Sequence, residues 1–407
     1  MHSPPSEVDA HQIEKLPTDD AWWNVYGPDQ AWNFKNLHRF MPKLNIHSNA
    51  PVSTLPERFM PIISEHIVKN GAKSLSFQSF LDSEESKTMG VIILHKGYIV
   101  FEHYPGQKHN DKTIYWSVTK VFVSALIGIL EDRGNINVNL PLVHYLPEVR
   151  KSHYALITIR NLLDMATGLD CPENYVDKNS HYYKYSVTVG DGFSEDTSPE
   201  NPYKFLSDLQ PKIIHPQGEF YQYSGVNTFF LSWVIEKLTN MSFHDALSVE
   251  IWSKIGAESN ASLLASSHGI ANTHGGLIST LRDVARFGLL FSPSYKTVSG
   301  EKLISDRVLE LISNGGNLKL WTKPREANQL PADFSHSIYQ WDAIYNNGDF
   351  YKGGWAGQGL LVNPKKDLVA VYSGYSIDAE QSQPSLLPIL RKVLNQFFPI
   401  RSSPDQH

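Results

Sequence analysis

Strand patterns lie near both ends of the chain, and helix patterns fill the part between them. Residues 89–104 predict a β-hairpin, with an apolar strand on either side of the turn Lys96-Gly97. Residues 359–363 and 368–372 predict two further strands, joined by a polar turn. Residues 386–398 have the apolar spacing of a closing amphipathic helix. We therefore expect one sheet built from both ends of the chain, with a helical part inserted in it.

The central part, roughly residues 117–290, predicts mostly helices. Its clearest helix has apolar residues at i, i+3, i+4 and i+7 spacing, which marks a buried helix: Val118, Val121, Phe122, Ala125, Leu126, Ile129 and Leu130. Gly134 follows as a C-terminal stop. Residues 229–238 and 281–290 predict further helices. The fold class is thus α/β (α+β), with helices flanking the sheet.

The same patterns divide the chain of 407 residues, which is long enough for one large domain or two of ordinary size. We expect a polar, loose tail over 1–19 and a short tail over 401–407. Residues 20–116 and 270–400 would form the sheet domain, and residues 117–269 a mainly helical domain.

One segment near the N-terminus is unusually aromatic. Within residues 20–42 it carries Trp22, Trp23, Tyr26, Trp32, Phe34 and Phe40. Aromatic side chains bury large apolar areas and are costly to leave in water. We expect this segment to pack on the main body.

Composition excludes several function classes. The chain has 36 basic and 42 acidic residues, a net charge of −6, and its basic residues form no stripe, so we expect no nucleic-acid or membrane partner. Its one cysteine, Cys171, excludes an intramolecular disulfide and any CxxC motif. The 17 histidines form no HExxH motif, and the nucleotide-binding glycine fingerprints are missing. We therefore expect no metal and no cofactor, and a small-molecule substrate.

The apolar segments of the sequence indicate the compartment. The apolar runs are too short to span a bilayer. Met1 is followed by polar residues and prolines, without the apolar stretch of a signal peptide. We expect a cytoplasmic protein, or a periplasmic or secreted one if an export signal was removed. A monomer and a homodimer both fit.

The first segment with chemical potential is Ser117-Val-Thr-Lys120. A second Ser-x-x-Lys, at Ser299 and Lys302, lacks its context. Ser117 precedes the most buried helix, and i,i+3 neighbours on a helix place Lys120 beside its hydroxyl. Burial disfavours the charged form of a lysine, and a neutral amine can act as a base toward a hydroxyl. The structural alternative is an N-cap serine with a lysine reaching to solvent.

The second segment is 220–228, where Tyr223 follows a Pro/Gly loop and precedes a helix. A tyrosine at such a junction can relay a proton at the edge of a cleft, although a core tyrosine has the same pattern. The third segment is 352–359, whose four glycines precede a strand. These glycines allow another backbone to approach closely, so the segment could bind an extended substrate or direct a backbone N–H at an oxyanion. The structural alternative is a glycine-rich turn or bulge.

Together the three segments resemble the penicillin-recognising serine hydrolases, which include class C β-lactamases, D-alanyl-D-alanine carboxypeptidases, esterases and 6-aminohexanoate-dimer hydrolases. The resemblance covers roughly residues 20–400. The aromatic N-terminal segment and the stretch 174–177 look most like the 6-aminohexanoate-dimer hydrolase branch. Further matching stretches are 115–120, 140–147, 157–169 and 274–287. The resemblance implies a β-lactamase/transpeptidase-like fold with an antiparallel sheet and an inserted helical domain.

The resemblance also implies roles for single residues. Ser117 matches the acylated nucleophile, Lys120 its partner base, and Tyr223 the tyrosine that gives a proton to the leaving amine. The oxyanion hole would consist of the backbone N–H groups of Ser117 and Trp355. Tyr175 matches a loop tyrosine that lies near the substrate. Whether Lys120 or Tyr223 is the base is left open, and the two can titrate as a unit.

Two departures narrow the implied activity. The second motif often reads Tyr-x-Asn, but here Gly225 stands at the third position, so Asn227 would have to substitute as a substrate contact. The third motif, Lys352-Gly353-Gly354, lacks a hydroxyl that would contact a substrate carboxylate. Both changes favour simpler amides or esters over β-lactams and peptides. The alternatives are a β-lactamase or D-alanyl-D-alanine carboxypeptidase, and, from another class, an inactive ligand-binding protein on the same fold.

Overall fold

The computed structural model of the chain describes residues 7–195, 198–321, 331–379 and 386–400. The expected tail over 401–407, and the first six residues of the tail over 1–19, lie outside these ranges. Within the N-terminal tail, residues Glu7–Glu14 form helix α1, so the expectation of a loose segment is wrong there. The sequence EVDAHQIE holds no proline or glycine, and propensity alone permits this helix.

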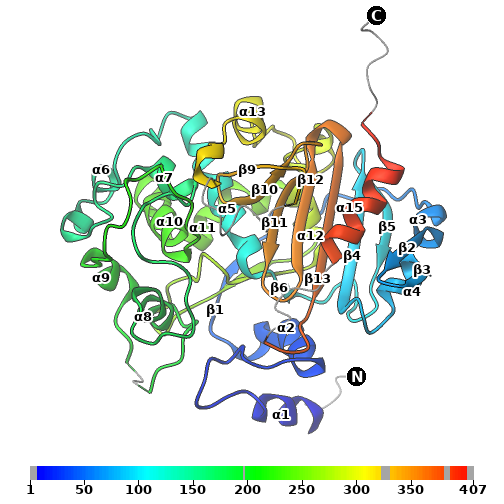
Figure 1. Cartoon of the computed structure of the whole chain (residues 1–407), viewed down its shortest axis with the longest axis horizontal. Helices are drawn as coiled ribbons and strands as arrows, with labels where there is room; N and C mark the ends of the chain where they lie inside the picture. The colour runs from blue at the N-terminus through cyan, green and yellow to red at the C-terminus, as the bar shows by residue number, and fades with distance from the viewer. Residues whose placement is uncertain (1–6, 196–197, 322–330, 380–385, 401–407) are drawn as a thin grey trace, which may run out of the picture.

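A seven-stranded antiparallel sheet forms the body of the molecule, in the order β5-β4-β13-β12-β11-β10-β9 (Figure 1). Its strands are β4 (Thr88–His95), β5 (Tyr98–His103), β9 (Phe334–Ile338), β10 (Trp341–Tyr345), β11 (Phe350–Gly354), β12 (Gln358–Asn363) and β13 (Leu368–Gly374). Strand β4 pairs with β13, with Val91 opposite Tyr372. The predicted hairpin and the predicted sheet from both chain ends are confirmed.

Helices cover both faces of this sheet. Along β4, Ile92 and Leu94 belong to the large core that contains the central helices. Val91 and Ile93 belong to a second core, which contains residues of helix α15 (Leu386–Phe397). Successive residues of a strand point to opposite faces, so a strand with both faces covered is a continuous apolar run.

The central helices agree with the predicted ones. They are α5 (Thr119–Asp132), α10 (Gly225–Thr239) and α12 (Leu281–Leu289), and Gly134 follows α5 with a φ of +73°. Further helices are α2 (Pro28–Phe40), α3 (Pro61–Glu65), α4 (Phe77–Leu81), α6 (Leu142–Tyr145), α7 (Ile159–Leu163), α8 (His181–Thr188), α9 (Pro202–Ser207), α11 (Phe243–Glu250) and α13 (Asp306–Asn314). Figure 1 shows α6 to α11 gathered beside the sheet. No helix within the described ranges is long and apolar enough to cross a membrane.

Short strands that the sequence analysis did not predict form two smaller sheets. One has the order β1-β7-β8-β6, from Lys43–Ile46, Ala261–Leu264, Leu277–Ser279 and Thr113–Ile114. The other pairs β2 (Ile67–Asn70) with β3 (Lys73–Ser76). Segments of two to four residues are too short to show an alternating pattern. The first sheet matters for the site because β6 ends three residues before Ser117 and β8 begins three residues after His274.

Candidate active site

Ser117 and Lys120 lie at the junction between a 3₁₀ turn and the buried helix. The turn η1 (Trp116–Val118) precedes α5, and Trp116 adopts a left-handed φ of +47°. This conformation costs free energy for a bulky residue and occurs mainly where surrounding structure imposes it. The Nζ of Lys120 lies 3.0 Å from the Oγ of Ser117. The predicted contact between these two side chains is therefore present in the structure.

Lys120 is fully buried, and its amine has two further oxygen neighbours. Nζ donates to the backbone carbonyl of His274, at 2.9 Å. It also lies 3.2 Å from Oε1 of Glu173, whose side chain keeps 23% of its area exposed. Nζ is hydrogen-bonded to the Ser117 hydroxyl and the His274 carbonyl, and the Glu173 carboxylate lies within ion-pair distance. The amine is thus held in one place, with Ser117 on one side.

Tyr223 joins this pair from the loop before α10. Its hydroxyl interacts with Ser117 and accepts a hydrogen bond from Nζ of Lys352, at 2.9 Å. The ring centroid lies 4.8 Å from Nζ of Lys120 and 4.6 Å from Nζ of Lys352. Burial raises the pKa of Tyr223 well above its usual value, and the charges of Asp342 and Glu173 add to this rise. Tyr223 is therefore a neutral phenol that touches the nucleophile.

Lys352 of β11 brings the third segment into the same cluster. Its side chain is fully buried and forms an ion pair with Asp342 of β10, the neighbouring strand. Burial lowers the pKa of Lys352 to about 8, and the charge of Asp342 opposes this fall. The structure places Lys352 against Tyr223 and outside the pocket lining, so its expected role as a substrate contact stays a prediction.

Gly354 lets the end of β11 approach the turn that carries Ser117. A Cβ atom at this position would lie 2.3 Å from the carbonyl oxygen of Tyr115, which is backbone. The next residue, Trp355, lines the same pocket as Ser117. An oxyanion hole from the N–H groups of Ser117 and Trp355 stays a prediction. Gly353 donates its N–H to Asp342 at 2.9 Å, which leaves that group engaged with the protein itself.

A cavity of about 260 Å³ opens above Ser117. Its lining is aromatic on several sides and acidic in part: Trp23, Trp116, Ser117, Glu173, Tyr175, Asp191, His274, Gly275 and Trp355. The ring of Trp23 meets those of Tyr175 and Trp355 edge-on, with centroids 5.2 and 5.1 Å away. The N-terminal aromatic segment thus packs on the main body as predicted, and it also forms a wall of the pocket.

The rim of the pocket is tied to that N-terminal segment by hydrogen bonds. Trp22 donates its indole N–H to the carbonyl of Gly190 at 3.0 Å, and Trp23 donates to that of Asp191 at 2.8 Å. The Trp22 ring stacks on Trp116, with centroids 5.6 Å apart. The residue next to the nucleophile is therefore covered by a segment that lies about 90 positions earlier in the chain.

Tyr175, predicted to lie near the substrate, lines the pocket. Its hydroxyl lies 3.1 Å from that of Tyr182 and donates to Oδ2 of Asp191 at 3.2 Å. Burial raises the pKa of Tyr175 well above its usual value. His274 contacts the same Asp191 oxygen through Nε2, at 3.0 Å, and the Tyr185 hydroxyl through Nδ1, at 2.9 Å. Asp191, Tyr175 and His274 therefore form one side of the pocket.

Asn227 is not brought to the pocket. It is fully buried in α10, and its amide lies 3.3 Å from the sulfur of Met165. Its expected contact with a substrate carbonyl stays a prediction without support from this placement.

Sequence reasoning missed Glu173, Asp342, Asp191 and His274. Glu173 stands directly before the stretch 174–177 that the resemblance singled out, but outside it. His274 begins another such stretch, but its contact with Lys120 is made by the backbone carbonyl, which any residue possesses. Nothing in the local sequence marks Asp342 or Asp191.

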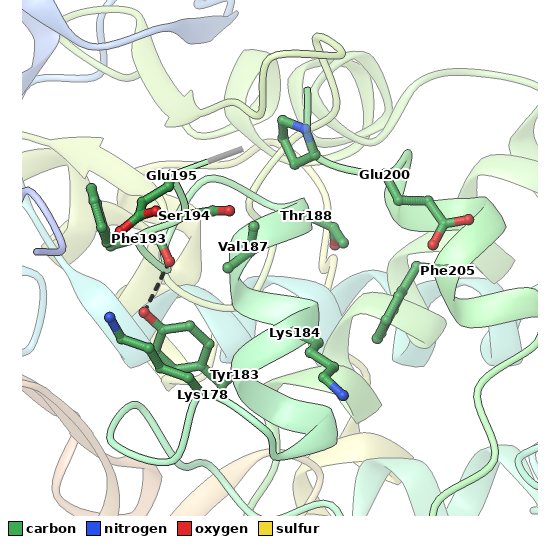
Figure 2. A pocket seen from close by; sticks show the side chains of 11 residues that line it. Lys178, Tyr183, Lys184, Val187, Thr188, Phe193, Ser194, Glu195, Glu200 and Phe205 are labelled. Atoms are coloured by element: carbon green, nitrogen blue, oxygen red, sulfur yellow. Dashed lines mark hydrogen bonds between the residues drawn. The ribbon is translucent and has the colours of Figure 1, made fainter. Parts of the chain in front are cut away.

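A larger cavity of about 460 Å³ lies elsewhere, along α8. Figure 2 shows Tyr183, Lys184, Phe193 and Phe205 around it, with the Tyr183 hydroxyl donating to the Phe193 carbonyl. None of the residues that line it belongs to the cluster around Ser117.

The part of the chain that the structure describes holds no group of three or more His, Cys, Asp or Glu side chains suited to a metal ion.

Comparison with known proteins assigns the class. A sequence profile described as Beta-lactamase matches residues 76–374, which is most of the chain. The chain therefore belongs to the beta-lactamase family of serine hydrolases. The predicted resemblance and the predicted β-lactamase/transpeptidase-like fold are confirmed.

Individual relatives give a more specific picture. The 6-aminohexanoate-dimer hydrolase of Paenarthrobacter ureafaciens is 27% identical over 357 residues, which cover 87% of each chain. The structure of a Bacillus anthracis protein assigned as a 6-aminohexanoate-dimer hydrolase covers 97% of this chain and 98% of its own, with a TM-score of 0.78 and 22% identity. The structure of EstCE1, a hydrolase with promiscuous acyltransferase activity, has a TM-score of 0.60 and 12% identity, and covers 78% of this chain and 96% of its own.

Proposed function

We propose that this protein cleaves an amide or ester bond through an acyl-enzyme on Ser117. The observation that carries the proposal is the position of the Lys120 amine, 3.0 Å from the Ser117 hydroxyl and buried in the protein. A hydroxyl needs an adjacent base to become a nucleophile, and a desolvated amine is such a base. The contact also exists before substrate arrives, so little reorganisation precedes the attack.

The first step is proton transfer from Ser117 to Lys120. The proton is accepted by the form of Lys120 whose lone pair faces Ser117, while Nζ keeps its hydrogen bond to the His274 carbonyl and lies 3.2 Å from the Glu173 carboxylate. The Ser117 O–H then donates to Nζ. Once the amine has taken the proton, the carboxylate of Glu173 and the carbonyl of His274 stabilise its charge. Lys120 is therefore the better placed base, and Tyr223, a buried phenol with a raised pKa, is the better placed acid.

The second step forms and collapses the tetrahedral intermediate. The Ser117 oxygen bonds to the substrate carbonyl carbon, and the carbonyl electrons move to the oxygen. We expect the N–H groups of Ser117 and Trp355 to bind this oxyanion, since two preorganised donors stabilise such a charge by several kcal/mol. The bond to the leaving group then breaks, and Tyr223 gives the leaving amine or alcohol its proton. The proton that Lys120 took from Ser117 then passes to the deprotonated Tyr223, which restores both groups and leaves the acyl-enzyme.

Hydrolysis of the acyl-enzyme repeats these steps with water. A water molecule attacks the ester carbonyl and gives a proton to the neutral Lys120. The bond to the Ser117 oxygen breaks, that oxygen takes the proton back, and the acid leaves.

The pocket favours a linear substrate with a cationic end. Its walls are aromatic, and its lining includes the carboxylates of Glu173 and Asp191. Oδ1 of Asp191 is buried and has no hydrogen-bond partner among the described residues. An alkyl chain with a terminal ammonium group would satisfy both features, through apolar contact, cation–π contact and ion pairing. A 6-aminohexanoate dimer, the substrate in the name of the Paenarthrobacter relative, has this form.

A substrate panel tests the proposal. We expect turnover of p-nitrophenyl esters and of linear ω-amino-acid amides, and little turnover of the β-lactam nitrocefin, because the third motif lacks the hydroxyl for a β-lactam carboxylate. Nitrocefin turnover above that of the linear substrates would favour a β-lactamase or carboxypeptidase instead. Mass spectrometry after a fluorophosphonate separates an enzyme from a binding protein: the enzyme gains one adduct on Ser117, and a pure binding protein gains none.

A further inference from the structure

The centre contains an ion pair between the buried Lys352 and the half-buried Asp342, and neither residue lines the substrate pocket. Lys352 has no exposed side-chain area, and its partner Asp342 keeps 31%. Burial of the Lys352 ammonium costs desolvation energy that its ion pair with Asp342 only partly returns, so stability alone is a weak reason for its presence. Lys352 contacts Tyr223, which points to a role in the reaction.

Asp342 is fixed by two contacts to the same segment. One carboxylate oxygen binds Nζ of Lys352, and the other accepts the N–H of Gly353 at 2.9 Å. These two donors belong to consecutive residues of β11, so the carboxylate holds both the backbone and the side chain of that strand. The antiparallel pairing of β10 with β11 brings Asp342 to this position.

Lys352 transmits this constraint to Tyr223. Its Nζ donates to the Tyr223 hydroxyl at 2.9 Å, so the phenol oxygen accepts from Lys352 and keeps its own O–H for another acceptor. In the reaction proposed above, this acceptor is the leaving group. A neutral Lys352 with no anion beside it would be free to turn away from the phenol. The charge of the ammonium, and hence its hold on the phenol oxygen, is maintained by Asp342.

We propose that Asp342 is a positioning residue of the centre, whose carboxylate holds the Lys352 ammonium on the Tyr223 hydroxyl so that Tyr223 protonates the leaving group. This inference rests on the proposed function and goes beyond it, because it assigns separate tasks to the two lysines. Lys120 activates Ser117, and the Asp342–Lys352 pair orients Tyr223. The first task is needed for every substrate, whereas the second is needed only when the leaving group requires a proton.

This division of tasks leads to a leaving-group test. p-Nitrophenyl butyrate expels p-nitrophenolate, which leaves without a proton, and ethyl butyrate expels an alkoxide that requires one. The two esters form the same acyl-enzyme, and kcat/KM reports its formation. We expect Asp342→Asn to lower kcat/KM for ethyl butyrate at least about tenfold. For p-nitrophenyl butyrate the loss should stay below about threefold, well short of the effect of removing a positioned acid or base.

The pH profile supplies a second readout. The ionisable groups around Lys352 are Asp342, Lys120, Glu173 and Tyr223, and Asp342 opposes the fall in the pKa of Lys352 that burial causes. Loss of the Asp342 charge should move the basic limb of the ethyl butyrate profile to lower pH. Lys352→Met should remove the basic limb itself and lower kcat/KM for ethyl butyrate as Asp342→Asn does. The double variant Asp342→Asn/Lys352→Met should be no less active than Lys352→Met alone, because both changes break one chain of contacts.

Controls separate this inference from a structural effect and from the proposed function. Asp333→Asn removes a carboxylate that pairs with Arg391 in the same sheet region, and should leave both esters unaffected. If Asp342→Asn does not fold, Asp342→Ser, which also removes the charge, takes its place. An equal loss on both esters, or no loss on either, would overturn the inference. Failure of the wild-type protein to hydrolyse either ester through Ser117 would instead overturn the proposed function.

Discussion

Nζ of Lys352 donates to the hydroxyl of Tyr223 at 2.9 Å, although 129 positions of the chain separate the two residues. One belongs to the sheet built by the chain ends, and the other to the loop before a helix of the central part. The contact joins the second and third of the predicted segments directly. It follows that these two segments act as one unit next to Ser117.

Replacement of Ser117 by alanine should remove hydrolysis and leave the fold intact. The side chain lies at the floor of a cavity, so loss of its hydroxyl removes the nucleophile without disturbing the core. The measurement is p-nitrophenyl ester turnover, with thermal unfolding as the control for folding. Ser299→Ala, in the other Ser-x-x-Lys sequence, is the matched control and should retain full activity. Substantial residual turnover in Ser117→Ala would contradict the assignment of the nucleophile.

Replacement of Lys120 by alanine should lower kcat/KM for every ester by about 10²- to 10⁴-fold, the usual contribution of a positioned base. The loss should not depend on the leaving group, since the base acts on Ser117. Steady-state kinetics with p-nitrophenyl butyrate measures it, and Lys302→Ala is the control. A loss of less than about tenfold would exclude Lys120 as the base.

Trp23 should affect substrate binding more than the chemical steps. Its ring forms a wall of the pocket, and its indole N–H holds the carbonyl of Asp191. Trp23→Ala should therefore raise KM for a linear amide about tenfold or more, because a buried aromatic contact is worth about 1–3 kcal/mol. Trp32→Ala, in the same segment but stacked on Phe40, is the control. If both variants change KM equally, the effect is one of the segment's stability and not of the pocket wall.

An alanine at Gly354 should disrupt the approach of β11 to the turn that carries Ser117. Its Cβ would lie 2.3 Å from the Tyr115 carbonyl oxygen, and backbone cannot yield as a flexible side chain does. We expect a loss of about 1–3 kcal/mol in the free energy of unfolding and a large loss of activity. Denaturant unfolding and ester turnover measure the two effects. Gly300→Ala, where a Cβ meets nothing within 4 Å, should change neither.

Activity toward unactivated substrates should fall as the pH rises through about 8. The pKa of Lys352 is lowered from 10.5 to about 8 by burial, so above this pH the lysine loses the proton that holds it on Tyr223. The expected result is a basic limb near pH 8 in kcat/KM for ethyl butyrate. p-Nitrophenyl butyrate, which needs no protonation of its leaving group, should lack this limb. If both esters show a basic limb at the same pH, the titrating group is not Lys352 acting through Tyr223.

Much of the fold could be predicted because its signals are local. The alternating and 3.6-residue patterns identified β4, β5, β12, β13, α5, α10, α12 and α15. The strands β1, β6, β7 and β8 were missed because two to four residues carry no period. Helix α1 was missed because its sequence shows no clear apolar face.

The contacts of the candidate site likewise fall into local ones, which the sequence predicts, and long-range ones, which it does not. The sequence by itself determined the Ser117–Lys120 pair, because residues three positions apart on one helical turn are neighbours whatever the rest of the chain does. Only the tertiary structure decided that Glu173 stands beside Lys120, that Asp342 binds Lys352, and that Trp23 closes the pocket. These contacts join residues tens or hundreds of positions apart. They depend on how strands pair and helices pack, which the residues around each position do not specify.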